Sequence, residues 1–207
     1  MAFVLLSFKV YLLQIVKMNP SYIADKTYKN QDYTVTDLQK AEYDNCTFIN
    51  CNFNACYLSS ITFLDCQFID CDLSNSKTSD TTYKDVIFKN CKLLGVLFND
   101  CNQLLMSITF DKCQLNFASF YQVKLISTTF TNCQFDKTEF TEANLTKCIF
   151  DNCDFSHAVF FNTNLEQANF LTSYNYSIHP GNNKIKGAKF SKDQIHGLLD
   201  AYKIHIS

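Results

Sequence analysis

The sequence predicts an all-β fold: a four-sided solenoid of about seven turns, built from short parallel strands and closed by a short C-terminal helix. Two observations predict it. A large apolar residue recurs at every fifth position over residues 33–170, and a phrase first seen as FINCNF at residues 48–53 returns every 20 or 22 residues. A period of five matches neither the α-helix nor the β-strand, so the chain must turn once per pentad.

Four pentads per turn place the repeated side chains in vertical columns inside the coil. Successive turns would lie about 4.8 Å apart, which gives a rod roughly 34 Å long. Large and small inward residues alternate, and this alternation would fill a narrow core without voids. One column contains Phe48, Phe68, Phe88, Phe110, Phe130, Phe150 and Phe170, and another contains Cys51, Cys71, Cys91, Cys113, Cys133 and Cys153. We expect these side chains to form the structural core.

The period slips once, by two residues, between Phe98 and Phe110. We expect a bulge within NDCNQLLMSIT, after which Leu105 resumes the inward series. Polar residues precede the cysteine column and suit turn corners and side-chain ladders; they are Asn50, Asp70, Asn90, Asn132 and Asn152.

The repeat at residues 33–170 separates two different ends. Residues 1–32 are predicted to be an N-terminal extension and cap. Their apolar start, MAFVLLSFKVYLLQIVK, is interrupted by Lys9 and is too short between charges to span a membrane. Residues 1–17 are interpreted as an upstream extension of the reading frame, with Met18 as an alternative start.

Residues 171–207 are predicted to form a loop, a capping helix and a tail. Ser191 and Gln194 have the spacing of a capping box, which marks a helix start. The apolar face of this helix would consist of Ile195, Leu198, Leu199 and Tyr202. It would close the core of one chain or pair two chains about a two-fold axis.

The 11 cysteines are predicted to be free, buried thiols that fill the small inward positions. Zinc would need four ligands that converge on one point, whereas these cysteines lie on successive faces. Column neighbours would have Cβ atoms about 4.8 Å apart, farther than the roughly 3.8 Å that a disulfide prefers. The four histidines belong to no recognisable catalytic arrangement. We therefore expect no catalytic residue, no metal and no cofactor, and a cytoplasmic location.

The charge of the chain is unevenly distributed. Residues 32–171 contain 17 Asp and Glu against 9 Lys, a net −8, whereas residues 184–207 contain 5 Lys against 2 Asp, a net +3. This balance disfavours direct binding of nucleic acid and suits a basic protein partner. Pairs of carboxylates share columns, and we predict a partner-binding surface from Asp65, Asp80, Asp85, Asp100, Asp111 and Asp151.

The A/C-x-L/F-x-x pattern resembles the pentapeptide-repeat family over about residues 33–170. The resemblance implies a right-handed, four-sided β-helix. Within that family, YKDVIFKNCKLLGVLF at 83–98 and GAKFSKDQIHGLLDAYKIHI at 187–206 are similar to the quinolone-resistance (Qnr-type) group. That similarity implies cytoplasmic dimers whose acidic, DNA-shaped rods bind type II topoisomerases such as DNA gyrase. This chain departs from the group in lacking long projecting loops over residues 53–98.

Together these features predict a non-catalytic rod that acts through its surface on a protein partner, with type II topoisomerase as the candidate. Rows of carboxylates along a rod can imitate a phosphate backbone and attract a basic groove. We expect neither nucleic acid nor membrane to be bound directly. The alternative is a structural or immunity-type scaffold whose partner has no relation to DNA.

Overall fold

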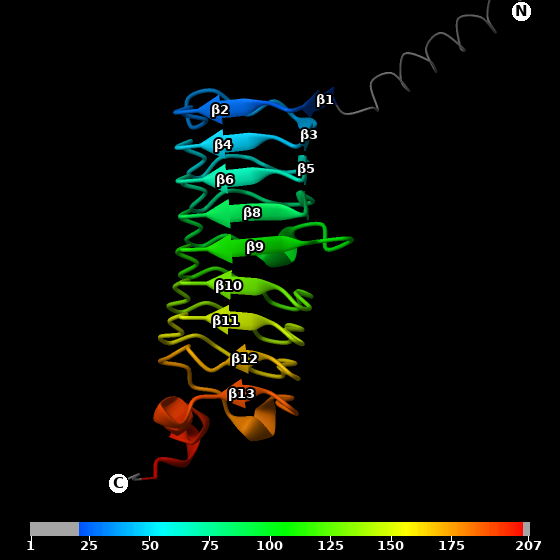
Figure 1. Cartoon of the computed structure of the whole chain (residues 1–207). Helices are drawn as coiled ribbons and strands as arrows, with labels where there is room; N and C mark the ends of the chain where they lie inside the picture. Colours follow the sequence, from blue (N-terminus) through cyan, green and yellow to red (C-terminus); the bar gives the residue numbers. More distant parts are fainter. Residues whose placement is uncertain (1–20, 205–207) are drawn as a thin grey trace, which may run out of the picture.

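Short parallel strands stack into a straight rod in the computed structural model, which describes residues 21–204 (Figure 1). The proposed extension at residues 1–17 and the alternative start at Met18 lie outside the described residues. Four strands form one side of the rod: β1 (Ser21–Ala24), β3 (Ala41–Asp44), β5 (Thr62–Leu64) and β7 (Thr82–Lys84).

A second side of the rod is a parallel sheet of nine strands. Its strands are β2 (Thr27–Lys29), β4 (Thr47–Ile49), β6 (Gln67–Ile69), β8 (Val86–Lys89), β9 (Ile108–Asp111), β10 (Thr129–Thr131), β11 (Ile149–Asp151), β12 (Asn169–Phe170) and β13 (Lys189–Phe190). The other two sides pair through single bridges, such as Asn52 with Asp72 and Ser119 with Glu139. Nine strand levels give about eight turns, one more than the period predicted.

The corners of the coil explain why the chain can turn every five residues. The last residue of nearly every pentad has a left-handed φ of +50° to +61°, a region in which Asn and Asp are enriched. Asn50 donates from Nδ2 to Asn30 Oδ1 over 2.8 Å, and Asn152 donates to Asn132 over 2.7 Å. The predicted role of these amides as corner residues and side-chain ladders is confirmed.

Aromatic rings stack through the whole length of the core. The phenylalanine column continues at both ends, because Tyr28 stacks on Phe48 and Phe190 stacks on Phe170. Centroids of neighbouring rings in this column lie 4.7–5.3 Å apart. This distance is close to the spacing of paired strands, so each ring lies over the ring of the turn below. The strand ladder accordingly begins before residue 33 and continues past residue 170.

The small inward positions hold side chains that donate hydrogen bonds, a role the sequence analysis did not assign to them. Cys71 Sγ donates to the carbonyl of Phe48 over 3.3 Å, and Thr81 Oγ1 donates to that of Leu58 over 2.8 Å. All 11 cysteines are free and buried. A thiol or hydroxyl at this position therefore donates a second hydrogen bond to a backbone carbonyl oxygen inside the core. With alanine there, that oxygen would accept only the hydrogen bond from the neighbouring strand.

The two-residue insertion lies at residues 103–107, inside the predicted bulge. Thr82 still pairs with Asn102, a step of 20, whereas Val86 pairs with Ile108, a step of 22. The prediction that Leu105 points inward is wrong: its side chain is 68 % exposed, and Met106 packs against the core instead. Two extra residues at this corner break the five-residue spacing, so the large apolar residue at the expected position, Leu105, is not the one that points inward.

The C-terminal end is closed by short 3-10 helices. The first is η3 (Lys192–Leu198) and the second is η4 (Asp200–Tyr202); two others are η1 (Phe98–Asp100) and η2 (Pro180–Asn182). Ser191 caps η3 by accepting from the amide of Asp193. The reciprocal bond of a capping box does not form, because the Gln194 carbonyl accepts from the amide of Asn175 instead.

Candidate interaction surface

Four of the six predicted acidic residues border one side of the rod, the four-stranded sheet. Asp65 and Asp85 directly follow β5 and β7, both in the left-handed conformation that Asp tolerates. At the corner before these strands, on the other margin of the same side of the rod, the amide of Asp80 donates to the carbonyl of Asp100 over 2.9 Å. The column of Asp65 and Asp85 and the column of Asp80 and Asp100 therefore flank the same side of the rod, one at each end of its strands.

The other two predicted acidic residues lie elsewhere. Asp111 ends β9 and Asp151 ends β11 in the nine-stranded sheet, where Thr131 separates them in register. The predicted column is correct, but it belongs to a different side of the rod. Asp111 and Asp151 are therefore not part of the face bordered by the first four.

Three further carboxylates, which the sequence analysis missed, complete this face. Glu42 and Asp44 lie on β3, and Asp25 follows β1. Extending the five-residue period back from Tyr33 to Tyr28 would have placed Asp25 at a corner. We call this set the acidic face; its members are Asp25, Glu42, Asp44, Asp65, Asp80, Asp85 and Asp100.

Hydrogen bonds orient two of these carboxylates. The hydroxyl of Tyr22 donates to Asp44 Oδ2 over 2.6 Å, and this bond raises the pKa of Tyr22 to about 12. Tyr22 therefore stays protonated at neutral pH and remains a donor. Asn45 Nδ2 donates to Asp25 Oδ1 over 2.7 Å. Both carboxylates gain a fixed direction.

None of the carboxylates of the acidic face forms an ion pair with a lysine among residues 21–204. Among residues 21–204 the one ion pair joins His157 to Asp136, over 2.7 Å, on another side of the rod. On the four strands of the acidic face the single lysine is Lys84, which ends β7. At the corner before β3, in the column of Asp80 and Asp100, lies Lys40. Seven carboxylates and two ammonium groups therefore give this face a net charge of about −5 at neutral pH.

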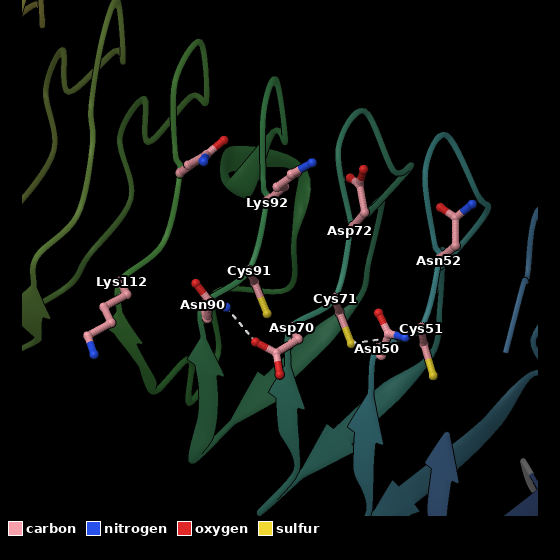
Figure 2. Close-up of a pocket in the computed structure, with 11 residues that line it drawn as sticks. Asn50, Cys51, Asn52, Asp70, Cys71, Asp72, Asn90, Cys91, Lys92 and Lys112 are labelled. Carbon is pink, nitrogen blue, oxygen red and sulfur yellow. Dashed lines mark hydrogen bonds between the residues drawn. The ribbon is translucent and has the colours of Figure 1, made fainter. Parts of the chain in front are cut away.

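A second surface feature is a groove of about 360 Å³ at the corner that follows the nine-stranded sheet. Figure 2 shows two parallel rows of side chains along it, Asn50, Asp70 and Asn90 in one and Asn52, Asp72 and Lys92 in the other. Asn90 donates to Asp70 within its row. Because Lys92 lies beside Asp72 and Lys112 lies at the end of the other row, the groove has mixed charge and little to attract a strongly basic partner.

The four residues predicted to cap the core or form a dimer divide between two environments. Leu198 packs against the core and Leu199 is half-buried. Ile195 is 41 % exposed and Tyr202 is 56 % exposed. The end of the rod is therefore closed mainly by Leu198 and by Gly197, which is buried against Tyr176. A dimer through this end stays a prediction.

No helix in residues 21–204 combines the length and the apolar character needed to cross a membrane. Within the same residues, no three His, Cys, Asp or Glu side chains converge so as to hold a metal ion. His157 lies at a corner, as the sequence placed it, and its Nδ1 lies 2.7 Å from Asp136 Oδ1.

Comparison with known proteins agrees with this architecture. A profile described as "Pentapeptide repeat region" matches residues 61–131, and one described as "Pentapeptide repeats (8 copies)" matches residues 113–151 and 138–170. The chain belongs to the pentapeptide-repeat family. The matched residues cover more than half of the chain, and they coincide with the regular part of the coil.

A solved structure shares the fold. A trypsin-treated variant of QnrB1, a plasmid-mediated fluoroquinolone resistance protein, is 19 % identical; the match covers 91 % of this chain and 92 % of that one, with a TM-score of 0.54. HetL, a pentapeptide-repeat protein involved in heterocyst differentiation regulation in the cyanobacterium Nostoc, is 13 % identical over 87 % of this chain and 92 % of that one, with a TM-score of 0.39. No curated protein matches the sequence at a significant level.

Proposed function

We propose that this pentapeptide-repeat protein is a non-catalytic, cytoplasmic rod whose acidic face binds the basic, DNA-binding surface of a protein partner. The candidate partner is a type II topoisomerase such as DNA gyrase. The observation that carries the proposal is the set of seven carboxylates on one side of a rigid ladder, with no ion-pairing lysine among residues 21–204.

The density of charge on the acidic face supports mimicry of DNA. Asp25 and Asp100 lie four strand levels apart, which is about 19 Å at the usual strand spacing. A net charge of about −5 over that length is one negative charge per roughly 4 Å of rod. Duplex DNA carries one per about 1.7 Å, and each of its strands one per about 3.4 Å. A protein groove that binds one DNA strand would therefore experience a similar electrostatic field from the acidic face.

The likeness to QnrB1 supports the choice of partner only as a hypothesis. At 19 % identity it concerns the fold. Within residues 21–204, the extra residues that break the strand register lie at 103–107, so binding would use the face of a sheet and not long loops. The charge of that face is the feature to test.

The test is DNA supercoiling by gyrase in the presence of ciprofloxacin. The wild-type protein at micromolar concentration should restore supercoiling. A variant with Asp65→Asn, Asp80→Asn, Asp85→Asn and Asp100→Asn should not, because most of the attraction for the basic groove is lost while Asn keeps the left-handed corners at residues 65, 80 and 85. The matched control is Asp111→Asn with Asp151→Asn, which removes two carboxylates from another side and should leave protection intact.

Two results would contradict the proposal. Wild-type protein that neither protects gyrase nor captures topoisomerase from a bacterial lysate would leave the alternative, a scaffold for an unrelated partner. Equal protection by the four-Asn variant would show that the acidic face is not the binding surface.

A further inference from the structure

One side of the rod exposes several large apolar side chains and few charges. Its turns pair through single bridges, such as Tyr57 with Lys77 and Leu97 with Ser119. Five large apolar side chains point outward along it, and Phe117, at the corner that precedes it, is 53 % exposed. We call this the apolar side; the five outward side chains are Tyr57, Leu97, Tyr121, Val159 and Phe161.

The outward row through Leu97 and Ser119 carries one lysine and one glutamate in matching places. Lys77 lies one turn before Leu97, and Glu139 lies one turn after Ser119; both are exposed. Within one chain they are three turns apart, about 14 Å at the usual strand spacing, which is too far for an ion pair. A row with opposite charges at equal distances from its middle is complementary to itself when it is turned end over end.

The apolar side also has a hollow and a projecting ring in matching places. A hollow of about 120 Å³ is lined by Asn75, Lys77, Gly95 and Leu97, among others. Gly95 lies at a left-handed corner and has no side chain to fill this space. In the next turn, the same corner position is held by Phe117 with its exposed ring. The hollow and the ring therefore lie on either side of the same middle point as the two charges.

We propose that two copies of this chain associate antiparallel through their apolar sides. The two-fold axis runs along the strand direction, between the turn of Leu97 and the turn of Ser119. Such an axis keeps the position of each residue within its pentad and exchanges the turns above it with those below. Lys77 then faces Glu139 of the second copy. Phe117 faces Gly95 and enters the hollow, and each contact occurs twice.

Apolar and electrostatic contributions both favour this pairing. Tyr57 faces Val159 and Leu97 faces Ser119, so apolar surface leaves water along the whole contact. Parallel rods, related by an axis along the rod, would leave Lys77 and Glu139 without an opposite charge. The contact spans six turns, about 29 Å, on one side of a narrow rod, which is small for a specific interface. We therefore expect a dimer of micromolar affinity that weakens as salt rises.

One pair of residues at the margin opposes the association. Asp80 and Glu142 hold equivalent corners toward the acidic face and would face each other across the axis. Both lie at the rim of the contact, where water and salt screen the repulsion, and Gln122 Nε2 donates to Glu142 Oε2 over 2.7 Å. The strands of the acidic face lie on the neighbouring side and stay open in the dimer. The inference therefore does not rest on the proposed function.

Charge reversal tests the pairing by sedimentation equilibrium of the full chain at about 0.05 M and about 0.5 M salt. Lys77→Glu and Glu139→Lys each place like charges opposite one another twice, so each variant alone should dimerise about tenfold more weakly at low salt. The double variant should recover the wild-type affinity, and so should an equimolar mixture of the two single variants. Recovery cannot arise within one chain, because the two residues are three turns apart.

Removal of the ring tests the hollow. Phe117→Asn should weaken the dimer about tenfold, and Asn is tolerated at left-handed corners. The matched control is Leu171→Asn, which removes a side chain of 48 % exposure beside the nine-stranded sheet and should leave the dimer unchanged. Circular dichroism checks that each variant is folded. The ring of Phe117 contributes to the dimer and little to the fold of one chain.

Cross-linking tests the direction of the two rods. Tyr57→Cys and Val159→Cys variants, mixed in equal amounts, should be joined by a short bis-maleimide reagent, whereas neither variant alone should be. In a parallel dimer each variant would cross-link to its own copy instead. The 11 native cysteines are buried and should not compete for the reagent.

Four outcomes would overturn the inference. The wild type could remain monomeric at about 100 µM chain and low salt. The double charge reversal could dimerise as weakly as the single variants. Tyr57→Cys alone could cross-link as readily as the mixture. Tyr202→Asp could abolish the dimer while Lys77→Glu leaves it intact, which would assign the dimer to the C-terminal end. None of these outcomes bears on gyrase protection, so the two proposals can fail separately.

Discussion

Replacing Phe130 by alanine tests whether the ring column holds the rod together. Phe130 is fully buried, with its ring 5.2 Å from that of Phe110 and 5.1 Å from that of Phe150. Truncating a buried phenylalanine costs about 3–5 kcal/mol. We expect the upper half of this range, about 4–5 kcal/mol, because the rings above and below are fixed by the strand ladder and cannot move together to fill the cavity. That is a large part of the stability of an ordinary domain.

The assay is urea unfolding followed by circular dichroism, with two comparison variants. Phe117→Ala removes a ring that is 53 % exposed and has Lys137 Nζ 5.3 Å from its centroid, so it should cost about 1 kcal/mol or less. Phe130→Leu keeps most of the volume and should cost about 1.5 kcal/mol, since leucine fills a neighbouring column. Costs for Phe130→Ala and Phe117→Ala within about 1 kcal/mol of each other would refute the stacked-core reasoning.

Three other perturbations probe the cap and the thiols. Gly197→Ala should detach the C-terminal end and lower the melting temperature, because its Cβ would collide with the carbonyl oxygen of Tyr176; an unchanged melting temperature would contradict this contact. Ellman's reagent at pH 8 should label almost no thiol in the native protein and all 11 after denaturation, since all are buried and burial raises the pKa of Cys66 to about 12; fast native labelling would contradict the burial. Burial also raises the pKa of Cys101 and Cys148 to about 12, from 9.0, so the folded state keeps protons that the unfolded state releases. The free energy of unfolding should therefore fall as the pH rises from about 9 toward 12, and a urea midpoint unchanged between pH 8 and pH 11 would contradict this linkage.

Most of the fold could be predicted because its fixed positions all face inward. A column such as Phe48 to Phe170 is visible as a period, since every turn must supply a ring of similar size to the same stack. The column continues to Tyr28 and Phe190, where the flanking pentads carry weaker signals, and the sequence analysis stopped short at both ends.

The errors arose where local geometry overrides the period. Leu105 fits the pattern of large apolar residues, yet two extra residues release the corner and turn it to solvent. The predicted capping helix is present as a 3-10 helix. Residues four and seven apart share a face in an α-helix but not in a 3-10 helix, so the predicted apolar face of Ile195, Leu198, Leu199 and Tyr202 does not form. Apolar spacing alone does not distinguish these helix types.

The acidic face was only half visible in the sequence. Columns such as Asp65 and Asp85 follow directly from the period, but whether two columns border the same side depends on the corner between them. In the structure, Asp80 and Asp100 lie at the other end of the strands of the same sheet, whereas Asp111 and Asp151 lie on another side of the rod. Surface residues carry no repeat constraint, so function has to be argued from charge and position.

Displacement of DNA from gyrase tests the central claim most directly. Fluorescently labelled duplex DNA bound to gyrase is titrated with this protein, and the fluorescence anisotropy of the DNA is followed at low and moderate salt. The account predicts that the wild-type rod displaces the DNA, less effectively at higher salt, and that the variant with Asn at residues 65, 80, 85 and 100 does not. DNA that stays bound at saturating rod concentration, or equal displacement by the four-Asn variant, would contradict it.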